Sequence, residues 1–543
     1  MSKVAEYLQE HLLGEVTSNT ETRRHLAHDA SILQMVPAIV AYPRNEDDIR
    51  KILRFSWQLA ERGRKLPVVA RGGGSDTSGA AITNGILIMT KAHMNRILAL
   101  DPRKPFVTAE PGLTYDKLQQ ALYTHGLFLP PEPASAAYAT LGGGLANNAV
   151  GPSPHKYGDT AKYVQSLRVA LANGELIETK NLSHRELNNK MGLSTLEGSI
   201  YRSLDALIEE NQPLIERLKN YEGPFFNAIG YNLAAVKSKN HFDLKPLFIG
   251  SKGTLGIITE ATLGLATHQP AVAMAIVSLS STSNLQELLP RILELKPSRV
   301  DFMNRAAIEQ VGRINPPQLT SALEVRTAEV HLFVEFDDAK DSARKKSLKS
   351  LQKLAEKADA YCHGTDDTEA QEVLLKIRES VSTILTEPHG QAKAVPVAED
   401  VHVPPTRLAE FINEAGNILS ASNIVPALWG NAASGIIRLH PILNLAEVGD
   451  RQKLFKISDQ LYALANNLGG SITAAAGDGR VRAPYARGVM GEEIYGLMVK
   501  VKNIFDPHGI LNPGVKFADV EDIKTLMRQG YSNAHRHEHL PRN

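Results

Sequence analysis

The chain has 543 residues, of which 43% are hydrophobic and 22% are charged, a composition typical of globular proteins with more than one core. The 60 Lys and Arg residues nearly balance the 59 Asp and Glu residues, so the net charge of +1 indicates no field that recruits nucleic acid or anionic lipid. The single cysteine, Cys362, excludes an intrachain disulfide and any cysteine-ligated zinc finger or iron–sulfur cluster. It favours a reducing compartment, and we expect the cytoplasm. No run approaches the roughly 18 apolar residues of a membrane span, although peripheral docking to a membrane stays open.

The first half of the chain alternates short β-rich runs with amphipathic stretches. Residues 36–180 contain runs such as PAIVAYP, LPVVARGG, GILIMT and SLRVALANG, separated by helical stretches such as NEDDIRKILRFSWQLAERG. Residues 181–245 are helical and charged, and residues 247–266 return to strand character. This alternation predicts a mixed α/β domain that ends near residue 268 and carries a helical insertion.

The second half mixes strands with longer amphipathic helices. Residues 270–490 contain the strands VAMAIVSLSS and AEVHLFVEFDD and helices such as QKLFKISDQLYALANNL. GEEIYGLMVKVKNIFDPHGILNP predicts a helix that stops at Pro and Gly. We therefore expect an α+β fold with domains at 1–268 and 269–490, a C-terminal segment at 491–525, and a flexible tail at 526–543 that carries His535, His537 and His539.

Two glycine clusters carry the first chemical signal. In VVARGGGSDTSGAAI, a strand runs into three glycines, which allow close backbone approach so that successive N–H groups can converge on a phosphate. Ala80 and Ala81 stand where a P-loop has Lys and Ser or Thr, which disfavours kinase chemistry. The second cluster, ATLGGGLANNAVG, has Asn147 where a Rossmann fingerprint has its third glycine.

The order and spacing of six motifs resemble a known family. RGGGSDTSG, PPEPASAAYATLGGGLANNAVG, HKYGDTAKYVQSLRVALANGELIET, GYNLAAV, FIGSKGTLGIITEATL and KNIFDPHGILNPGVKF follow one another over residues 30–520. This series resembles the FAD-linked oxidases and dehydrogenases of the vanillyl-alcohol oxidase superfamily, and within it the D-lactate, glycolate and D-2-hydroxyacid dehydrogenases. The resemblance implies a two-part FAD-binding domain of the p-cresol methylhydroxylase type, followed by an α+β cap domain for the substrate.

The resemblance also implies which residues hold the cofactor. Backbone amides of the two glycine-rich segments would wrap the FAD pyrophosphate, and the C-terminal segment would close the site near the flavin ring. The residues implied are Arg71, Gly72, Gly73, Gly74, Ser75, Ser78, Gly79, Pro133, Thr140, Gly142, Gly143, Asn147, Ile258 and Asn512.

Two positions depart from the family pattern near the cofactor. Several relatives bind FAD covalently through a histidine whose place Ser75 takes here, so we expect noncovalent FAD. Lys252 stands in GSKG where the family usually has Glu, and it either pairs with the pyrophosphate or is a solvated surface lysine.

The substrate half departs further from the pattern. Relatives hold the substrate hydroxyl with a divalent metal, bound by two histidines on one strand and by a Glu whose neighbouring His is the base. Asn431 and Arg438 take the two histidine places, and Ala475 and Ala476 take the places of Glu and His in SITAAAGDGRVRAPY. An amide, a guanidinium and two methyl groups supply no adequate ligand set, so we expect no metal site.

The remaining polar residues form a candidate catalytic set. Arg438 would bind a carboxylate or a developing oxyanion in place of the ion, or it points to solvent from an alternating strand. His440 is the best base candidate in that strand, against the alternative of a packed histidine. By resemblance Arg378 would bind the substrate carboxylate, unless it pairs on the helix surface with Glu379 or Glu372.

Two further segments hold other candidate residues. Glu399 and His402 form either a proton relay or structural hydrogen bonds. Arg480, Arg482 and Tyr485 complete the expected pocket, and the two arginines share a face if the segment is extended.

Three functions stay open on this basis. The first is an FAD-dependent oxidoreductase that oxidises a small organic acid or alcohol without a metal and passes electrons to an acceptor or separate redox partner that the sequence does not name. The second is a metal-dependent D-2-hydroxyacid dehydrogenase whose ligands lie elsewhere. The third is a flavin-binding subunit or scaffold with a degenerate active site.

Overall fold

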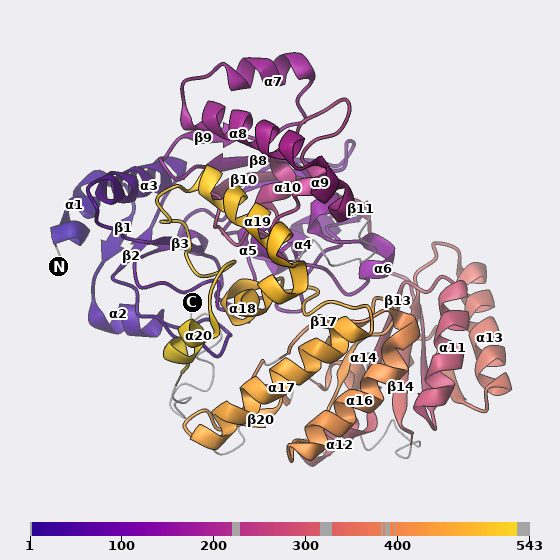
Figure 1. Cartoon of the computed structure of the whole chain (residues 1–543). Helices are drawn as coiled ribbons and strands as arrows, with labels where there is room; N and C mark the ends of the chain where they lie inside the picture. Colours follow the sequence, from indigo (N-terminus) through magenta and orange to yellow (C-terminus); the bar gives the residue numbers. More distant parts are fainter. Residues whose placement is uncertain are drawn as a thin grey trace.

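The computed structural model describes residues 3–219, 229–314, 328–381, 384–385, 391–396 and 398–528. They form two lobes (Figure 1). The N-terminal lobe holds the described residues of 3–268 together with the returning C-terminal segment 478–528, and the cap lobe holds the described residues of 269–477. In the described part of the chain, no helix combines the length and apolar character needed to cross a membrane. The histidine-rich end of the expected tail lies outside the described residues.

A four-stranded sheet in the order β1-β2-β4-β3 forms the first half of the N-terminal lobe. The strands β2, β4 and β3 are parallel and almost wholly buried, as apolar strands covered on both faces should be. The strands are β1 (Glu15–Thr17), β2 (Ile39–Tyr42), β3 (Val68–Arg71) and β4 (Ile86–Met89).

Helix α3 (Glu46–Glu61) covers this sheet because its sequence places apolar residues at helical spacing. Asn45 caps it, with a side chain that accepts a hydrogen bond from the Asp48 amide, and acidic residues fill its first turn. Its buried face, with Ile49, Ile52 and Leu53, joins the core of the parallel strands. Two further helices, α1 (Lys3–His11) and α2 (Thr20–His25), precede it.

An antiparallel five-stranded sheet in the order β5-β6-β10-β8-β9 forms the second half of the lobe. Its central strand β10 (Ile257–Gly264) alternates buried and half-buried residues, so the strand predicted within 247–266 is confirmed over its second half. The other strands are β5 (Ile97–Asp101), β6 (Phe106–Ala109), β8 (Val164–Ala170) and β9 (Leu176–Glu178). The short pair β7 (Leu127–Phe128) and β11 (Ala266–Thr267) lies beside it.

Helices surround this second sheet, and the predicted helical insertion is present in the described part of 181–245. Helix α8 (Leu196–Glu210) buries one apolar face, with Ile200, Leu204 and Ile208 among its core residues. The others are α4 (Tyr115–Tyr123), α5 (Leu141–Asn147), α6 (Pro154–Tyr157), α7 (His184–Met191), α9 (Gln212–Lys219) and α10 (Lys245–Phe248).

The cap lobe is built on a seven-stranded antiparallel sheet in the order β15-β12-β14-β13-β18-β19-β17. All seven residues of β12 are buried, because its alternate residues join two separate hydrophobic clusters, one on each face of the sheet. Its strands are β12 (Ala273–Leu279), β13 (Arg299–Asn304), β14 (Val330–Phe336), β15 (Tyr361–Thr365), β17 (Val401–His402), β18 (Trp429–Asn431) and β19 (Ile436–Arg438). A separate pair consists of β16 (Lys393–Ala394) and β20 (Ile442–Leu443).

Helices cover the cap sheet, and the predicted amphipathic stretches all form them. They are α11 (Thr282–Glu294), α12 (Arg305–Ile314), α13 (Asp341–Lys357), α14 (Thr368–Glu379), α16 (Leu408–Ala421) and α17 (Val448–Asn467). Together with the sheets, they confirm the predicted α+β class.

The chain then returns to the N-terminal lobe, as the yellow helices of Figure 1 show. Helix α18 (Gly479–Met490) begins the return, α19 (Glu492–Phe505) packs against α8, and Leu511 pairs with Val68 at the edge of the first sheet. Helix α20 (Val520–Leu526) follows.

Arg480 and Arg482 would share a face only in an extended segment, and this condition is not met, because residues 480–485 lie in α18. The Asp478 side chain caps the helix by accepting a hydrogen bond from the Gly479 amide at 2.9 Å. In a helix, residues two apart point in different directions, so Arg480 and Arg482 do not share a face.

Candidate cofactor and substrate cavity

A cavity of about 560 Å³ lies between the two lobes. One wall consists of the loop after β3, the segment that leads into α5, and the loop before β10. The other wall belongs to the cap lobe. The cap residues that line the cavity are Leu385, Lys393, Ala394, Pro396, Glu399, Asp400, Arg438, His440, Ala475 and Ala476.

The glycines let the two glycine-rich segments touch through their backbones. A Cβ added to Gly72 would lie 1.9 Å from Thr140 Oγ1, and one added to Gly73 would lie 1.9 Å from the carbonyl oxygen of Tyr138. Gly74 has a φ of +73°, which favours glycine. The segments therefore form a close backbone surface with amide groups at the cavity wall, which fits the pyrophosphate of a dinucleotide.

Helix α5 presents its first turn to the same cavity. The Thr140 side chain caps it by accepting a hydrogen bond from the Gly143 amide at 3.3 Å. Gly142 and Gly143 follow in the cavity wall, but the Gly142 amide donates to the carbonyl oxygen of Pro111 at 2.8 Å, so this turn supplies backbone surface to the wall rather than free amides.

Most of the predicted cofactor residues line the cavity. They are Arg71, Gly72, Gly73, Gly74, Ser75, Pro133, Thr140, Gly142, Gly143, Asn147 and Ile258. Three others, Ser78, Gly79 and Asn512, lie behind the wall. Asn512 donates from Nδ2 to the carbonyl oxygens of Ala80 and Lys252, at 2.8 Å in both cases, so it joins two cavity loops without lining the cavity.

Arg71 ties the start of the first glycine-rich loop to the segment that follows α2. Its Nη1 donates to the carbonyl oxygens of His28 at 2.7 Å and Leu26 at 3.2 Å. Burial lowers the pKa of this guanidinium from its ordinary value, although the charges of Asp29 and Asp76 oppose that shift.

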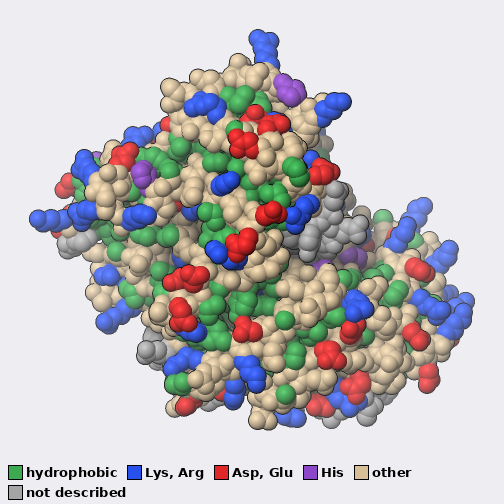
Figure 2. Space-filling view, in the orientation of Figure 1, with side chains coloured by type: hydrophobic (Ala, Val, Ile, Leu, Met, Phe, Trp, Pro, Cys, Tyr) green, Lys and Arg blue, Asp and Glu red, His purple; other side chains and the backbone are tan. Residues whose placement is uncertain are grey.

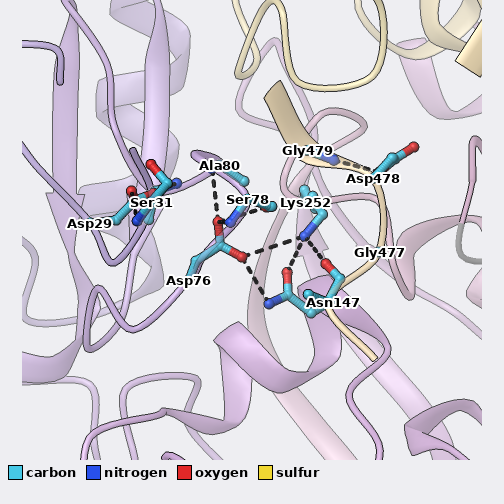
Figure 3. Close-up of polar contacts among 12 residues, drawn as sticks. Asp29, Ser31, Asp76, Ser78, Ala80, Asn147, Lys252, Gly477, Asp478 and Gly479 are labelled. Carbon is cyan, nitrogen blue, oxygen red and sulfur yellow. Dashed lines mark hydrogen bonds and ion pairs between the residues drawn. The ribbon is translucent and has the colours of Figure 1, made fainter. Parts of the chain in front are cut away.

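Lys252 is buried in the cavity wall, so the solvated alternative for this residue is wrong. Its Nζ donates to Asn147 Oδ1 and to the carbonyl oxygen of Ala476, both at 2.6 Å, and lies 3.5 Å from Asp76 Oδ1. Figure 3 shows this ammonium group pointing into the space between Asp76 and Asn147.

The turn that carries Ala475 and Ala476 is held by a buried ion pair. Arg482 Nη2 lies 3.0 Å from Asp400 Oδ1, and its Nη1 donates to the carbonyl oxygen of Gly477 at 2.8 Å. The Asp400 carboxylate in turn accepts a hydrogen bond from the Ala476 amide. Arg482 thus shapes the turn and does not line the cavity.

The frame of this turn, Gly477-Asp478-Gly479, ties it to the N-terminal lobe. The Asp478 side chain accepts hydrogen bonds from the Gly230 amide at 2.9 Å and from Lys516 Nζ at 2.7 Å. All three groups are buried. Asp478 is therefore a structural anchor, while the two alanines face the cavity.

Arg438 and His440 both line the cavity from the cap side. His440 Nε2 lies 3.3 Å from Glu399 Oε1, and its ring stacks on Trp429 with centroids 5.5 Å apart. Burial by itself raises the pKa of Glu399, but its interactions with His440, Arg438 and Thr77 together bring the pKa down to about 2. Glu399 is thus a carboxylate that holds and orients the imidazole.

Three other predicted residues lie outside the cavity wall. Arg378 is buried between Asp301, at 3.8 Å, and Glu335, at 3.5 Å. Arg480 donates to the carbonyl oxygen of Ile82 at 3.1 Å and to Asn512 Oδ1 at 3.0 Å.

Tyr485 donates to Asp459 Oδ1 at 2.7 Å. The guanidinium group of Arg378 thus pairs with carboxylates of the cap lobe, and that of Arg480 holds neighbouring loops together.

Asn431, at a place where relatives have a metal-binding histidine, is hydrogen-bonded to neighbouring groups of the cap lobe. Asn431 Nδ2 donates to Asp301 Oδ1 at 3.0 Å, and its Oδ1 accepts from the Ser434 amide at 2.9 Å. Among the residues that the structure describes, no group of three or more His, Cys, Asp and Glu side chains lies close enough to hold a metal ion.

Lys393 lines the cavity although no sequence pattern pointed to it. It lies in the two-residue strand β16. A lysine in such a segment carries no periodic signal, and only the pairing of β16 with β20 brings it to the cavity.

The comparisons with known proteins agree with the motif series. A family model described as an FAD binding domain matches residues 37–180, and one described as the C-terminal domain of FAD linked oxidases matches residues 268–515. D-2-hydroxyglutarate dehydrogenase of Escherichia coli (strain K12) is 31% identical to 93% of this chain, which covers 50% of that protein. The chain thus spans about half the length of that relative.

Two shorter relatives match over most of their length. Glycolate oxidase subunit GlcD of Bacillus subtilis (strain 168) is 28% identical, with 89% of this chain and 90% of that protein covered. D-lactate dehydrogenase of Archaeoglobus fulgidus is also 28% identical, with 88% and 90% covered.

Solved structures share the fold. p-Cresol methylhydroxylase with substrate bound has a TM-score of 0.69 at 13% identity, with 96% of this chain and 97% of that chain covered. 4-Ethylphenol oxidase from Gulosibacter chungangensis has a TM-score of 0.67 at 15% identity, with 96% and 98% covered. The chain thus combines an FAD binding domain, over residues 37–180, with a C-terminal domain of the FAD linked oxidases, over residues 268–515.

Proposed function

We propose that the protein is an FAD-dependent oxidoreductase that oxidises the hydroxyl-bearing carbon of a small 2-hydroxy acid or alcohol. One observation carries the proposal: a single cavity joins the glycine-rich cofactor wall to a cap wall with Arg438, Lys393 and the His440–Glu399 pair. The named relatives act on D-2-hydroxyglutarate, glycolate and D-lactate, which are all 2-hydroxy acids.

The cofactor wall suits FAD because its backbone surface is open to a pyrophosphate and leaves no room for side chains at Gly72 and Gly73. When bound, FAD supplies the acceptor for the hydride that leaves the substrate carbon. Ser75 lines the wall at the place of the family's attachment histidine, and no His or Cys is among the described residues of the N-terminal lobe that line the cavity. We therefore propose noncovalent binding.

Two cations on the cap wall are suited to a carboxylate. Arg438 offers a planar fork of N–H donors that matches a carboxylate, and Lys393 adds a point charge. In this arrangement Arg438 fixes the substrate in the cavity and supplies positive charge where relatives use an ion. We propose a metal-independent site on that ground.

His440 is the group that accepts the hydroxyl proton. Glu399 accepts a hydrogen bond from His440 Nε2, which leaves Nδ1 to take the proton. The Glu399 carboxylate then stabilises the imidazolium that forms, in the way that a carboxylate orients a catalytic histidine in other enzymes. The electron acceptor is a separate molecule or redox partner.

The test begins with the FAD-loaded protein. Its visible spectrum is recorded under anaerobic conditions with a panel of D- and L-2-hydroxy acids and simple alcohols, before and after treatment with a chelator. Bleaching of the flavin band by a 2-hydroxy acid, unchanged by the chelator, is the expected result. Acid precipitation should release the flavin into the supernatant. Bleaching that disappears with the chelator would instead identify a metal-dependent dehydrogenase.

A second function is favoured by the two alanines of the cavity turn. Ala475 and Ala476 offer no proton or charge at the position where relatives have acid and base, as expected of a flavin-binding subunit without turnover. A protein that binds FAD but is bleached by no acid or alcohol of the panel would support this alternative.

A further inference from the structure

Lys252 combines full burial with an unfavourable backbone conformation. Its side chain is 0% exposed, and its φ of +54° lies in the left-handed region, which is costly for a residue with a Cβ. Bonds on both sides impose this conformation: its amide donates to the Ala146 carbonyl oxygen at 2.9 Å, and its carbonyl oxygen accepts from Asn512. Strain held in this way is a feature of functional sites.

The ammonium group of Lys252 contacts three separate segments of the chain. Asp76 comes from the loop after β3, Asn147 from the end of α5, and the Ala476 carbonyl oxygen from the cap turn. All three partners line the cavity, as does Lys252 itself. Two of these segments form the cofactor wall, whereas the third forms the substrate wall.

Asp76 fixes the ammonium group from the cofactor side. Its Oδ2 accepts hydrogen bonds from the Ser78 amide at 3.1 Å and the Ala80 amide at 2.9 Å, and its Oδ1 accepts from Asn147 Nδ2 at 3.1 Å. Figure 3 shows these bonds converging on the carboxylate. Amides of the loop after β3 fix the Asp76 carboxylate, and this carboxylate pairs with Lys252. The position of that loop therefore determines where the ammonium group contacts the cap turn.

We infer that Lys252 is a positioning residue that keeps the cap turn Thr473–Gly477 in register with the two cofactor-binding segments. This inference rests on the proposed function, in which the turn forms part of the substrate wall. Loss of the ammonium group leaves Ala476 without its bond to the N-terminal lobe and removes the ion pair with Asp76. The turn then opens, and the cavity loses its fit to a small acid bound beside FAD.

Another buried lysine provides a matched control. Lys502 Nζ also has three partners, the carbonyl oxygens of Thr254 and Leu511 and the Asp506 carboxylate, but none of them lies in the cap turn. Lys502→Met therefore removes a buried ammonium group without touching the cavity. Lys252→Met removes both the charge and the bond to Ala476, and Lys252→Gln keeps a donor that can reach neighbouring oxygens.

The first experiment is hydrogen–deuterium exchange on the full chain without FAD. A charged hydrogen bond of ordinary strength corresponds to a change of about tenfold or more in local opening. We expect amides of residues 473–477 to exchange about tenfold faster in Lys252→Met, less so in Lys252→Gln, and at the wild-type rate in Lys502→Met. Equal exchange in wild type and Lys252→Met, or equally faster exchange in Lys502→Met, would overturn the inference.

The second experiment uses the FAD-loaded proteins and oxalate, an acid that cannot be oxidised as a 2-hydroxy acid. Perturbation of the flavin band by oxalate gives its dissociation constant, which should rise at least tenfold in Lys252→Met and stay unchanged in Lys502→Met. If oxalate perturbs no variant, including wild type, the proposed function fails while the exchange result still decides the role of Lys252. If both Lys252 variants fail to fold although Lys502→Met folds, the residue serves stability and the inference is overturned.

Discussion

At the scale of single residues, the arginines show what a sequence pattern can and cannot locate. Arg438 was expected in the substrate pocket and does line the cavity, because it ends a strand whose register with β18 fixes its direction. Arg378 lies outside the wall because Asp301 and Glu335, distant in sequence, surround its guanidinium. Which carboxylates meet a buried arginine is decided by tertiary packing, and no local motif contains that information.

The role proposed for Arg438 leads to a prediction on substrate affinity. Arg438→Met keeps much of the apolar stem and removes the cation, so a carboxylate substrate loses a charged hydrogen bond worth about 1.5–3 kcal/mol. We expect KM for the acid that bleaches the flavin to rise about 10- to 100-fold. Initial rates over a range of substrate concentrations measure this change.

The control for that variant is Arg487→Met, which removes an arginine that pairs with Glu492 on the exposed surface. Its KM should equal that of the wild-type protein. An unchanged KM in Arg438→Met would assign carboxylate binding to another cation, with Lys393 the first candidate.

At the scale of elements, the sequence located the glycine-rich wall of the cavity because the signal for it is local. A strand that ends in consecutive glycines predicts a close backbone turn, and β3 is followed by such a turn. Helix α18 was missed because alternate arginines suit a strand as well as a helix, and the capping bond of Asp478 is visible only in the structure. The sequence motif therefore gave the place of the turn but not the direction of its side chains.

The backbone contact between the glycine-rich segments predicts the effect of a single methyl group. In Gly73→Ala the new Cβ would lie 1.9 Å from the Tyr138 carbonyl oxygen, so the two segments must move apart. Overpacking of this kind costs about 1–3 kcal/mol, and we expect FAD affinity to fall about 10- to 100-fold. Titration of the protein with FAD, followed by flavin fluorescence, gives the dissociation constant.

Gly496→Ala is the matched control, because no atom lies within 4 Å of the added Cβ and the residue lies in helix α19. Alanine is favoured over glycine inside a helix, so this variant should be at least as stable as wild type and bind FAD equally well. Equal FAD affinity in Gly73→Ala would show that this wall does not hold the cofactor.

A buried histidine makes the cap sheet sensitive to acid. His331 in β14 is hydrogen-bonded to Ser278 at 2.9 Å, and burial together with the charge of Arg305 lowers its pKa to about 4. As the pH is lowered through 6.5, this histidine is protonated in the unfolded chain but stays neutral in the folded cap. The free energy of unfolding therefore decreases as the pH falls. Between pH 6.5 and pH 5 the loss from this residue is about 2 kcal/mol.

Chemical unfolding of the cap can be followed by Trp429, which lies in the same sheet, in a Trp57→Phe background. His331→Gln should show a smaller decrease in unfolding free energy between pH 6.5 and pH 5 than the protein with His331. Since His402 also has a pKa of about 4, some acid sensitivity should remain in the variant. Identical pH dependence with and without His331 would contradict a neutral buried imidazole.

At the scale of the whole molecule, six ordered motifs were enough to predict the α+β class and the family, because they span the cofactor lobe and the returning segment. The sequence did not predict how the cap turn is held against the N-terminal lobe. Lys516 and Gly230 bind Asp478, and Lys252 binds Ala476, across separations of up to 248 residues. Such bonds join single residues without any periodic pattern.

These bonds, and a cavity with walls from both lobes, predict that cofactor binding stabilises the two lobes together. Free FAD at 100 times its dissociation constant adds about 2.7 kcal/mol to the unfolding free energy of each part of the protein that unfolds together with the binding site. Trp57 lies in the N-terminal lobe and Trp429 in the cap lobe, so single-tryptophan variants report each lobe during thermal unfolding. We expect removal of FAD to lower both midpoints by a similar amount. A lower midpoint for Trp57 alone would mean that the cofactor contacts only the N-terminal lobe, and the shared cavity could not then bring a bound flavin to the residues of the cap.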